Sequence, residues 1–266
     1  MILDEIAEKT RERIAAEKKS FPFEELRRRA EALASDNETD NPKQLPFYRA
    51  LKTPDISFIC EVKKASPSKS VIAEHFPYLQ IAEEYEKAGA NAISCLTEPY
   101  YFLGSDRYLQ EITNQVTIPV LRKDFTVDAY MIYQAKVLGA SAVLLICSIL
   151  SQTEIEEYQA IATELGLSAL VEAHDEREVE MALRADASII GVNNRDLKTF
   201  TVDINNSARY RSMVPEDIAF VSESGIRTRE DIEKLVENGT DAVLIGETLM
   251  RSADKKQALD ILRGNR

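Results

Sequence analysis

An apolar, β-branched run followed by a charged amphipathic segment recurs eight times along this chain, and this alternation constrains the fold most. The runs are apolar throughout, which is typical of strands buried on both faces of a parallel sheet. Eight such units without a long linker favour an α/β fold with a closed, eight-stranded parallel (β/α)8 barrel, the TIM barrel, over an open doubly wound sheet. The predicted strands cover 57–64, 92–98, 119–124, 142–149, 168–174, 188–194, 219–224 and 242–248.

Glycines mark the ends of four predicted helices, each just before the next apolar run: Gly89, Gly139, Gly166 and Gly239. A glycine readily adopts the left-handed conformation that ends a helix, so these positions are predicted helix stops. No GxGxxG sequence follows the first strand, and a dinucleotide-binding fold therefore loses its best support.

Residues 1–56 lie outside the repeat. The segments 4–19 and 23–34 have helical spacing and dense charge, which predicts a helical extension that caps one end of the barrel. An alternative is that part of the extension, 47–51, folds over a substrate. We expect all 266 residues to form one domain, with the barrel over 57–266.

The net charge of the chain limits the classes of partner that it can bind. It has 33 Lys and Arg against 45 Asp and Glu, a net charge of −12. This balance argues against nucleic-acid or anionic-membrane binding, which needs a basic footprint, but it leaves room for a small anionic ligand.

The N-terminus is charged from its fourth residue, and the longest uncharged stretch, 137–150, is too short to cross a bilayer. We expect a cytoplasmic protein that is a monomer, with a weak homodimer as the alternative.

The cysteines and histidines show no metal-binding spacing. Cys60, Cys95 and Cys147 each lie inside an apolar run without a CxxC pair, and we expect buried free thiols. His174 follows Glu172 by two residues, but no third ligand accompanies this pair at a suggestive spacing. We therefore expect no metal.

Charged or amide residues occur where the predicted strands end. In a (β/α)8 barrel these ends form the mouth where catalytic groups lie. An uncompensated charge there would cost several kcal/mol, and a structural salt bridge could remove that cost for one pair. Two lysines and three glutamates from four strands are more than such a pair, so the pattern predicts a catalytic mouth. Its residues are Glu61, Lys63, Lys123, Glu172, Asn193 and Glu223.

Glycines also follow the last two predicted strands. Ser224 and Gly225 precede a helix that opens near Thr228, and Gly246 follows the last strand. In barrels these two loops often bind a phosphate through backbone N–H groups. One such glycine usually marks only a turn, but two at these positions favour a phosphate site.

Seven segments of the chain form a set with a characteristic order along the strands: CEVKKASPSKS (60–70), FLGS (102–105), VLRKDF (120–125), VEAHDE (171–176), GVNNRDLKTF (191–200), SESGI (222–226) and LIGETLM (244–250). Taken together, they resemble the indole-3-glycerol-phosphate synthase family of tryptophan biosynthesis. The family often has glycine where Ser70 stands, and the loop 75–79 departs from its usual Asp-Pro form. Neither departure removes a charged group from the mouth.

The resemblance implies a reaction on a phosphorylated small molecule, 1-(2-carboxyphenylamino)-1-deoxyribulose 5-phosphate. Its aromatic ring attacks the C2′ carbonyl, carbon dioxide leaves and then water leaves, giving indole-3-glycerol phosphate. No cofactor is expected, because ring closure and dehydration are acid–base steps.

The resemblance also implies residue roles. Lys123 would be the general acid of ring closure and Glu172 the general base of dehydration. Lys63 would contact the substrate or expel the hydroxyl, and the sequence leaves open which lysine serves which step. Glu61 would orient a lysine and bond substrate hydroxyls.

The remaining roles concern binding. Asn193 and Arg195 would hold the carboxylated end of the substrate, and Glu223 would support its hydroxyls. Phe102, Phe125 and Leu197 resemble walls of the aromatic pocket, with ordinary packing as the alternative. The phosphate region would comprise Ser66, Ser224, Gly225, Gly246 and Glu247, the last through its backbone N–H.

Two other functions deserve comparison. Another phosphate-binding barrel enzyme, phosphoribosylanthranilate isomerase, uses a cysteine and an aspartate, but Cys60 immediately precedes Glu61 and should face away from the mouth. A non-catalytic phosphate-binding barrel would be expected to lack a mouth lysine or Glu172, and all of them are present.

Overall fold

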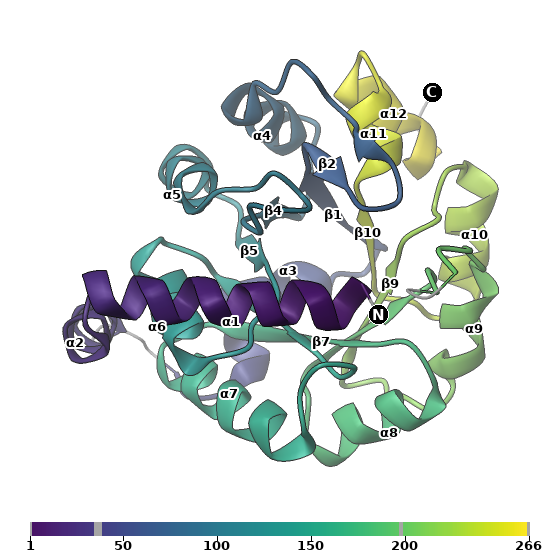
Figure 1. Cartoon of the computed structure of the whole chain (residues 1–266). Coiled ribbons are helices and arrows are strands. Elements are labelled where there is room, and N and C mark those ends of the chain that lie inside the picture. The colour runs from purple at the N-terminus through teal and green to yellow at the C-terminus, as the bar shows by residue number, and fades with distance from the viewer. Residues whose placement is uncertain (1, 35–38, 197–198, 265–266) are drawn as a thin grey trace.

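A closed barrel of eight parallel strands forms the centre of the protein (Figure 1). The computed structural model describes residues 2–34, 39–196 and 199–264. Each barrel strand neighbours the next one along the chain, and β1 closes the ring against β10, which confirms the predicted α/β barrel. The barrel strands are β1 (Ser57–Val62), β4 (Ala92–Leu96), β5 (Val120–Lys123), β6 (Ala142–Ile146), β7 (Ser168–Ala173), β8 (Ile189–Asn193), β9 (Ala219–Glu223) and β10 (Ala242–Ile245).

Every barrel strand ends one to three residues earlier than predicted; β1, for example, ends at 62 rather than 64, and β10 at 245 rather than 248. The polar residues at the mouth therefore lie at or just beyond the last strand position. The loop after β1 contains a short antiparallel hairpin, β2 (Ala65–Ser66) and β3 (Ser70–Val71).

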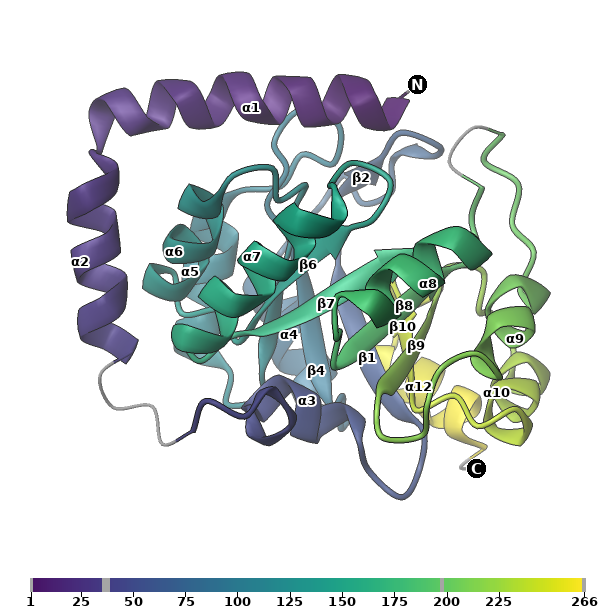
Figure 2. The same ribbon diagram turned by 90° about the horizontal axis from the view of Figure 1, so that it is seen from below.

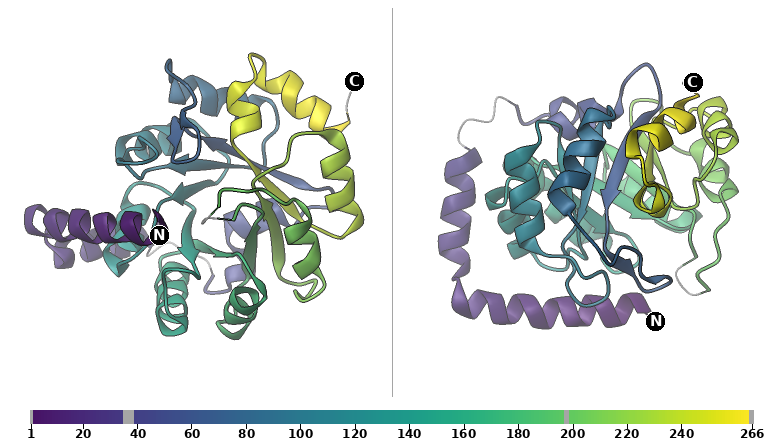
Figure 3. Two further views of the ribbon diagram at one scale, coloured as in Figure 1. Left: turned by 45° about the vertical axis from the view of Figure 1, so that its right-hand side comes forward. Right: turned by 90° about the horizontal axis from the view of Figure 1, so that it is seen from above.

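A ring of helices surrounds the barrel (Figure 3, left). The four glycines predicted to end helices all have positive φ, between 72° and 84°, as a left-handed helix end requires. The helices after β1 are α4 (Tyr78–Lys87), α5 (Asp106–Gln115), α6 (Ala129–Val137), α7 (Gln152–Glu164), α8 (Glu176–Arg184), α9 (Asn205–Arg211), α10 (Arg229–Glu237), α11 (Glu247–Arg251) and α12 (Lys255–Arg263).

The alternation of side chains along each strand divides the core into two layers. On β1, Ile59 belongs to the cluster inside the barrel, whereas Cys60 belongs to the cluster between the strands and the helices. All three cysteines are buried free thiols, as predicted. Cys60 therefore faces away from the mouth, which removes the basis of the cysteine-dependent alternative.

The N-terminal extension covers both ends of the barrel (Figure 2; Figure 3, right). It consists of α1 (Ile2–Ser20), α2 (Phe23–Ala34), a 3-10 turn η1 (Pro42–Gln44) and α3 (Pro46–Leu51). α1 lies across the mouth, while α2 runs along the side of the barrel and α3 lies at the opposite end.

The interpretation that 47–51 folds over a substrate is wrong. Phe47, Tyr48 and Leu51 are buried against the interior cluster at the end where the strands begin. The hydroxyl of Ser57, the first residue of β1, donates to the backbone carbonyl of Leu51 at 3.2 Å. These apolar side chains of α3 cover the barrel interior at this end, which would otherwise be open to water.

Contacts on the rim hold α1 over the mouth. Arg13 pairs with Asp124 at 2.9 Å, and Lys18 pairs with Asp128 at 2.6 Å. The Tyr101 hydroxyl donates to a carboxylate oxygen of α1 at 2.6 Å. None of the helices in the described ranges is both long and apolar enough to cross a membrane.

Candidate active site

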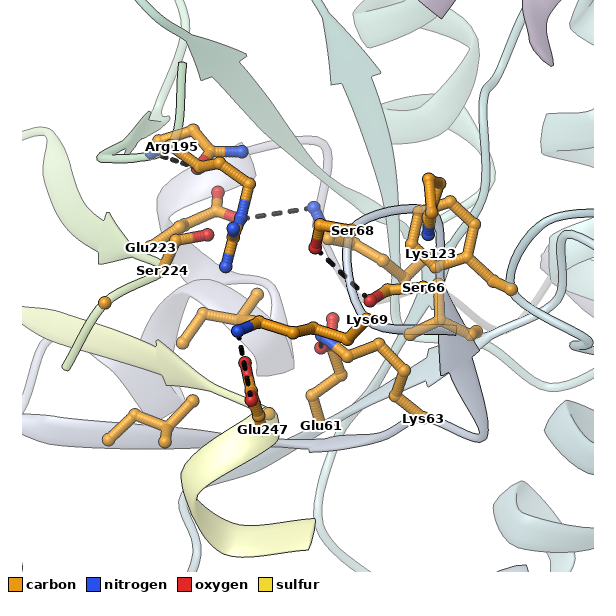
Figure 4. A pocket seen from close by; sticks show the side chains of 18 of the residues that line it. Glu61, Lys63, Ser66, Ser68, Lys69, Lys123, Arg195, Glu223, Ser224 and Glu247 are labelled. Carbon is orange, nitrogen blue, oxygen red and sulfur yellow. Dashed lines mark hydrogen bonds and ion pairs between the residues drawn. The ribbon is translucent and has the colours of Figure 1, made fainter. Parts of the chain in front are cut away.

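A cavity of about 580 Å³ opens at the mouth of the barrel, under α1 (Figure 4). Its size suits a small-molecule substrate. Leu197, predicted as a wall, lies outside the described residues. The structure brings all the other predicted site residues to this cavity: Glu61, Lys63, Ser66, Phe102, Lys123, Phe125, Glu172, Asn193, Arg195, Glu223, Ser224, Gly225, Gly246 and Glu247.

Lys123 lies between two glutamates on the floor of the cavity. Its Nζ is 2.7 Å from Glu172 Oε2 and 3.2 Å from Glu223 Oε2. The Lys123 side chain is 13% exposed, and those of the two glutamates only 4% and 2%. Asn193, paired with Glu223 in the β8–β9 register, donates Nδ2 to Glu172 Oε1 at 3.2 Å. Four strand ends thus converge on one buried ammonium–carboxylate cluster.

A second lysine–glutamate pair lies across the same cavity. Glu61 ends the inward-facing row of β1, and the Lys63 ammonium donates a hydrogen bond to it (Figure 4). Both side chains point into the cavity, as their shared strand face predicted.

Glycine at position 246 leaves room for this pair. A Cβ on Gly246 would lie 2.2 Å from Glu61 Oε2 and 2.9 Å from Lys63 Nζ, so these side chains would have to move. Gly191 leaves the same room for Glu223, since its Cβ would lie 2.3 Å from Glu223 Oε1. The sequence predicts only a phosphate-binding role for Gly246 and none for Gly191, because neither contact can be seen along the chain.

The loops after β9 and β10 form one side of the cavity. Ser224 and Gly225 both have positive φ, 68° and 85°, so the backbone turns sharply where β9 ends. The next helix, α10, begins after Thr228, whose side chain accepts from the Asp231 N–H at 3.2 Å. Glu247 follows Gly246 at the start of α11.

Basic side chains also surround these loops. Lys69, Arg227 and Arg251 line the cavity together with Arg195. Lys69 Nζ lies 3.9 Å from Glu247 Oε1. Figure 4 marks this ion pair with a dashed line. The site is therefore locally positive within an acidic protein, which suits an anionic group.

An apolar wall stands on the other side of the cavity. The rings of Phe102 and Phe125 are tilted against each other with centroids 6.1 Å apart. Ile2, Leu3 and Ile6 of α1 complete the wall from above. The sequence does not identify these α1 residues as part of the site, because an amphipathic pattern does not show what the apolar face covers.

Known proteins resemble this chain over nearly its whole length. A sequence profile described as indole-3-glycerol phosphate synthase matches residues 3–262. The indole-3-glycerol phosphate synthase of Ruminiclostridium cellulolyticum is 55% identical over 265 residues, which cover 100% of both chains. That of Endomicrobium trichonymphae is 52% identical over 263 residues, 99% of this chain and 100% of the relative.

The chain belongs to the indole-3-glycerol phosphate synthase family. Solved structures with the same fold include a 3-hexulose-6-phosphate synthase, with a TM-score of 0.62 at 14% identity over 79% of this chain and 99% of that chain. At this identity the likeness shows the barrel fold alone.

In this indole-3-glycerol phosphate synthase site, burial and charge together set the protonation states. Burial by itself would lower the pKa of Lys123, but the charges of Glu172, Glu223 and Glu61 raise it above its ordinary value. Burial by itself would raise the pKa of Glu172, but the charge of Lys123 and the contact with His174 hold it below its ordinary value. The lysine therefore stays a proton donor and Glu172 a carboxylate.

Glu223 differs from Glu172. Burial raises its pKa, Lys123 lowers it and the charge of Glu172 raises it again, to about 7. Two glutamates that share one lysine thus have pKa values shifted in opposite directions, as is typical of acid–base sites.

A buried carboxylate, Glu98, supports the loop of the apolar wall and is not among the residues predicted from the sequence. Glu98 is fully buried and accepts backbone N–H bonds from Tyr100, Tyr101 and Phe102 at 2.9, 2.7 and 2.9 Å. It thereby fixes the loop that carries Phe102 into the cavity. The spacing of Glu98 just beyond the end of β4 was the available signal.

His174 contacts Glu172 of the buried cluster. Among residues 2–34, 39–196 and 199–264, no group of three or more His, Cys, Asp or Glu side chains could hold a metal ion. Ser148, His174 and Glu178 do lie together, but Ser148 Oγ and Glu178 Oε2 approach the same ring nitrogen, Nδ1. Because the Ser148 hydroxyl donates to Glu178, this group does not form a nucleophilic triad.

Proposed function

We propose that the protein is a carbon–carbon lyase, an indole-3-glycerol-phosphate synthase. It converts 1-(2-carboxyphenylamino)-1-deoxyribulose 5-phosphate into indole-3-glycerol phosphate, carbon dioxide and water. The observation that carries this proposal is the buried contact of Lys123 with Glu172, which faces a cavity between glycine loops and an aromatic wall.

We assign the binding roles by chemistry. The 5′-phosphate would lie against the loops of Gly225 and Gly246, where the backbone can approach an anion closely and basic side chains gather. Ser66, Ser224 and the N–H of Glu247 would complete that subsite. The carboxyphenyl ring would lie on Phe102 and Phe125.

The polar end of the ring needs its own partners. Arg195 and Asn193 would hold the carboxylate; the Arg195 backbone N–H already donates to Asn193 Oδ1 at 3.0 Å, which ties the two together. Glu61 and Glu223 would accept hydrogen bonds from substrate hydroxyls.

Lys123 would act first. The ring carbon that bears the carboxylate attacks the C2′ carbonyl carbon, and the Lys123 ammonium gives its proton to the carbonyl oxygen as the C–C bond forms. The bond to the carboxylate then breaks, carbon dioxide leaves, and its electron pair restores the aromatic ring.

Glu172 and Lys63 would act in dehydration. Glu172 removes a proton from the carbon next to the new hydroxyl-bearing carbon, and Lys63 protonates the hydroxyl, which leaves as water. Each step moves protons between substrate and side chains of this chain, so we propose that the reaction needs no cofactor.

The test is product formation followed by indole fluorescence, in the wild type and in Lys123→Ala and Glu172→Gln. Each positioned acid or base contributes roughly 10²–10⁴-fold, so both variants should lose at least about 100-fold in kcat. Lys87→Ala, at an exposed lysine, is the control for loss of one positive charge.

Two results would contradict the proposal. A wild-type protein that forms no indole-3-glycerol phosphate ends the functional assignment, and near-wild-type turnover in Lys123→Ala ends its role as general acid. Because Lys123→Ala leaves two buried carboxylates without their cation, circular dichroism should confirm that the variant is folded.

A further inference from the structure

The imidazole ring of His174 lies between two carboxylates. Its Nε2 is 3.3 Å from Glu172 Oε1, an ion pair without hydrogen-bond alignment, and its Nδ1 is 3.1 Å from Glu178 Oε2. The His174 side chain is 15% exposed and that of Glu178 9% exposed. A ring placed this way can bond both carboxylates only when both nitrogens carry protons.

Hydrogen bonds fix the backbone of His174 and the carboxylate beside its ring. The His174 backbone N–H donates to Glu178 Oε2 at 2.8 Å, so one carboxylate holds both the backbone and the ring of this residue. Ser148 Oγ, from the loop after β6, donates to Glu178 Oε1 at 2.7 Å. Asn206 of α9 donates to the His174 carbonyl at 3.1 Å.

The groups that contact the His174 ring come from three elements. β7 presents Glu172, and α8 presents Glu178, whose own backbone N–H donates to Asp175 at 2.9 Å. The loop after β6 presents the neutral Ser148 hydroxyl, 3.2 Å from Nδ1, and Asn206 of α9 contacts the His174 carbonyl. Lys123 of β5 pairs with the other oxygen of Glu172. Among the described residues, the charged groups in contact with the ring are therefore these two carboxylates.

We propose that His174, held by Glu178, is a positioning residue for the general base: as an imidazolium it fixes Oε1 of Glu172 and leaves Oε2 facing Lys123 and the substrate. This inference rests on the proposed function, in which Glu172 is the base of dehydration. Glu172 is then held between two cations, one near each oxygen, with Asn193 as a further neutral donor.

The electrostatics agree with this geometry. Burial alone would lower the pKa of His174, but its contacts with Glu172 and Glu178 and their charges raise it to about 10. The imidazolium in turn lowers the pKa of Glu172. If the ring lost its proton, a lone pair would face a carboxylate, and Glu172 would lose this orienting contact.

The first test reads the charge of the ring directly. The chain has two histidines, His75 and His174, so ¹⁵N-labelled imidazole signals are few, and the His75→Gln variant assigns them. His75 is exposed and does not line the cavity. We expect both His174 nitrogens to be protonated at pH 8; a neutral ring at pH 8 overturns the proposal.

The second test removes the outer carboxylate with Glu178→Gln, which keeps its shape. The His174 titration should move down by one pH unit or more, and kcat should fall at least threefold as pH rises through the new midpoint. Glu176→Gln, an exposed glutamate on the same helix, is the matched control and should leave both measurements unchanged.

The outcomes separate cleanly. In Glu178→Gln, the proposal is supported if kcat falls at the same pH at which NMR shows His174 losing its proton, because loss of a merely structural contact would lower kcat at every pH. The proposal is overturned if the His174 titration shifts but kcat does not fall at high pH. Failure of the proposed function itself shows differently, as absence of product in the wild type.

Discussion

Glu223→Gln should make the protein more resistant to unfolding at high pH than the wild type. The Glu223 side chain is 2% exposed, and only its Oε2 has a hydrogen-bond partner within the described residues, Lys123. Burial raises the pKa of Glu223, the charge of Lys123 lowers it, and the charge of Glu172 raises it again, so that it moves from 4.5 to about 7. Above pH 7 the Glu223 side chain is therefore ionised in the folded protein, and its buried surroundings stabilise this carboxylate less than they stabilise the protonated carboxyl group.

The sign and size follow from linkage. A group with a raised folded pKa contributes stability that is fully present below its unfolded value, here 4.5, and is lost as pH rises through about 7. At about 1.4 kcal/mol per pKa unit, this loss amounts to about 3 kcal/mol. Glutamine has the same shape but does not ionise, so the variant does not lose this stability as pH rises.

The measurement is urea-induced unfolding of both proteins between pH 4.5 and 8. The free energy of unfolding of the variant, minus that of the wild type, should increase by about 3 kcal/mol across this range. Glu237→Gln, at an exposed position on α10, is the control for removing one carboxylate. A difference that stays flat, or that falls with pH, would refute the assignment of a proton to buried Glu223.

Three further outcomes are expected. Gly246→Ala should lower kcat about 100-fold, as well as raise KM, because its Cβ would push the Glu61 carboxylate aside by about 1 Å; an effect on KM alone, in steady-state kinetics, would contradict this. Arg13→Met should raise KM several-fold because it releases α1 from buried Asp124, whereas Arg11→Met, an exposed arginine on the same helix, should leave KM unchanged. The extension 1–56 and the barrel should unfold in one transition, because they share the interior cluster; separate transitions by fluorescence and circular dichroism would show two domains.

Local patterns carried the prediction of the barrel and of most of its mouth. Buried strands are recognisable because their apolar runs are continuous, and helix ends because a glycine must supply positive φ. Lys123 and Glu172 could be predicted as site residues because each is a charged residue near the C-terminal end of an apolar run. The predicted strands ran too far because they included residues at the mouth, most of them polar, that follow the last ladder position.

What the sequence could not supply was contact between distant segments. That α1 rather than 47–51 covers the cavity depends on pairs such as Arg13 with Asp124, which lie 111 residues apart. That contact depends on the closed barrel, not on any local spacing. His174 is a different case, because Glu178 lies only four residues away, but the spacing alone does not show that its carboxylate reaches the ring.

The barrel closes between the first and the last of its strands to be synthesised, β1 and β10. The N-terminal extension, made earliest, has partners that are made late: Lys52 pairs with Asp241 at 2.6 Å, and the Tyr48 hydroxyl donates to the Asp217 carbonyl at 2.8 Å. During translation, one edge of β1 and part of the surface of the extension therefore stay without their partners until nearly the whole chain has been made. Long-range closure of this kind is slow, and an open strand edge invites association with other chains. We expect nascent chains that end before Ala242 to be the aggregation-prone species of this protein, and a chaperone that shields the edge of β1 to raise its yield.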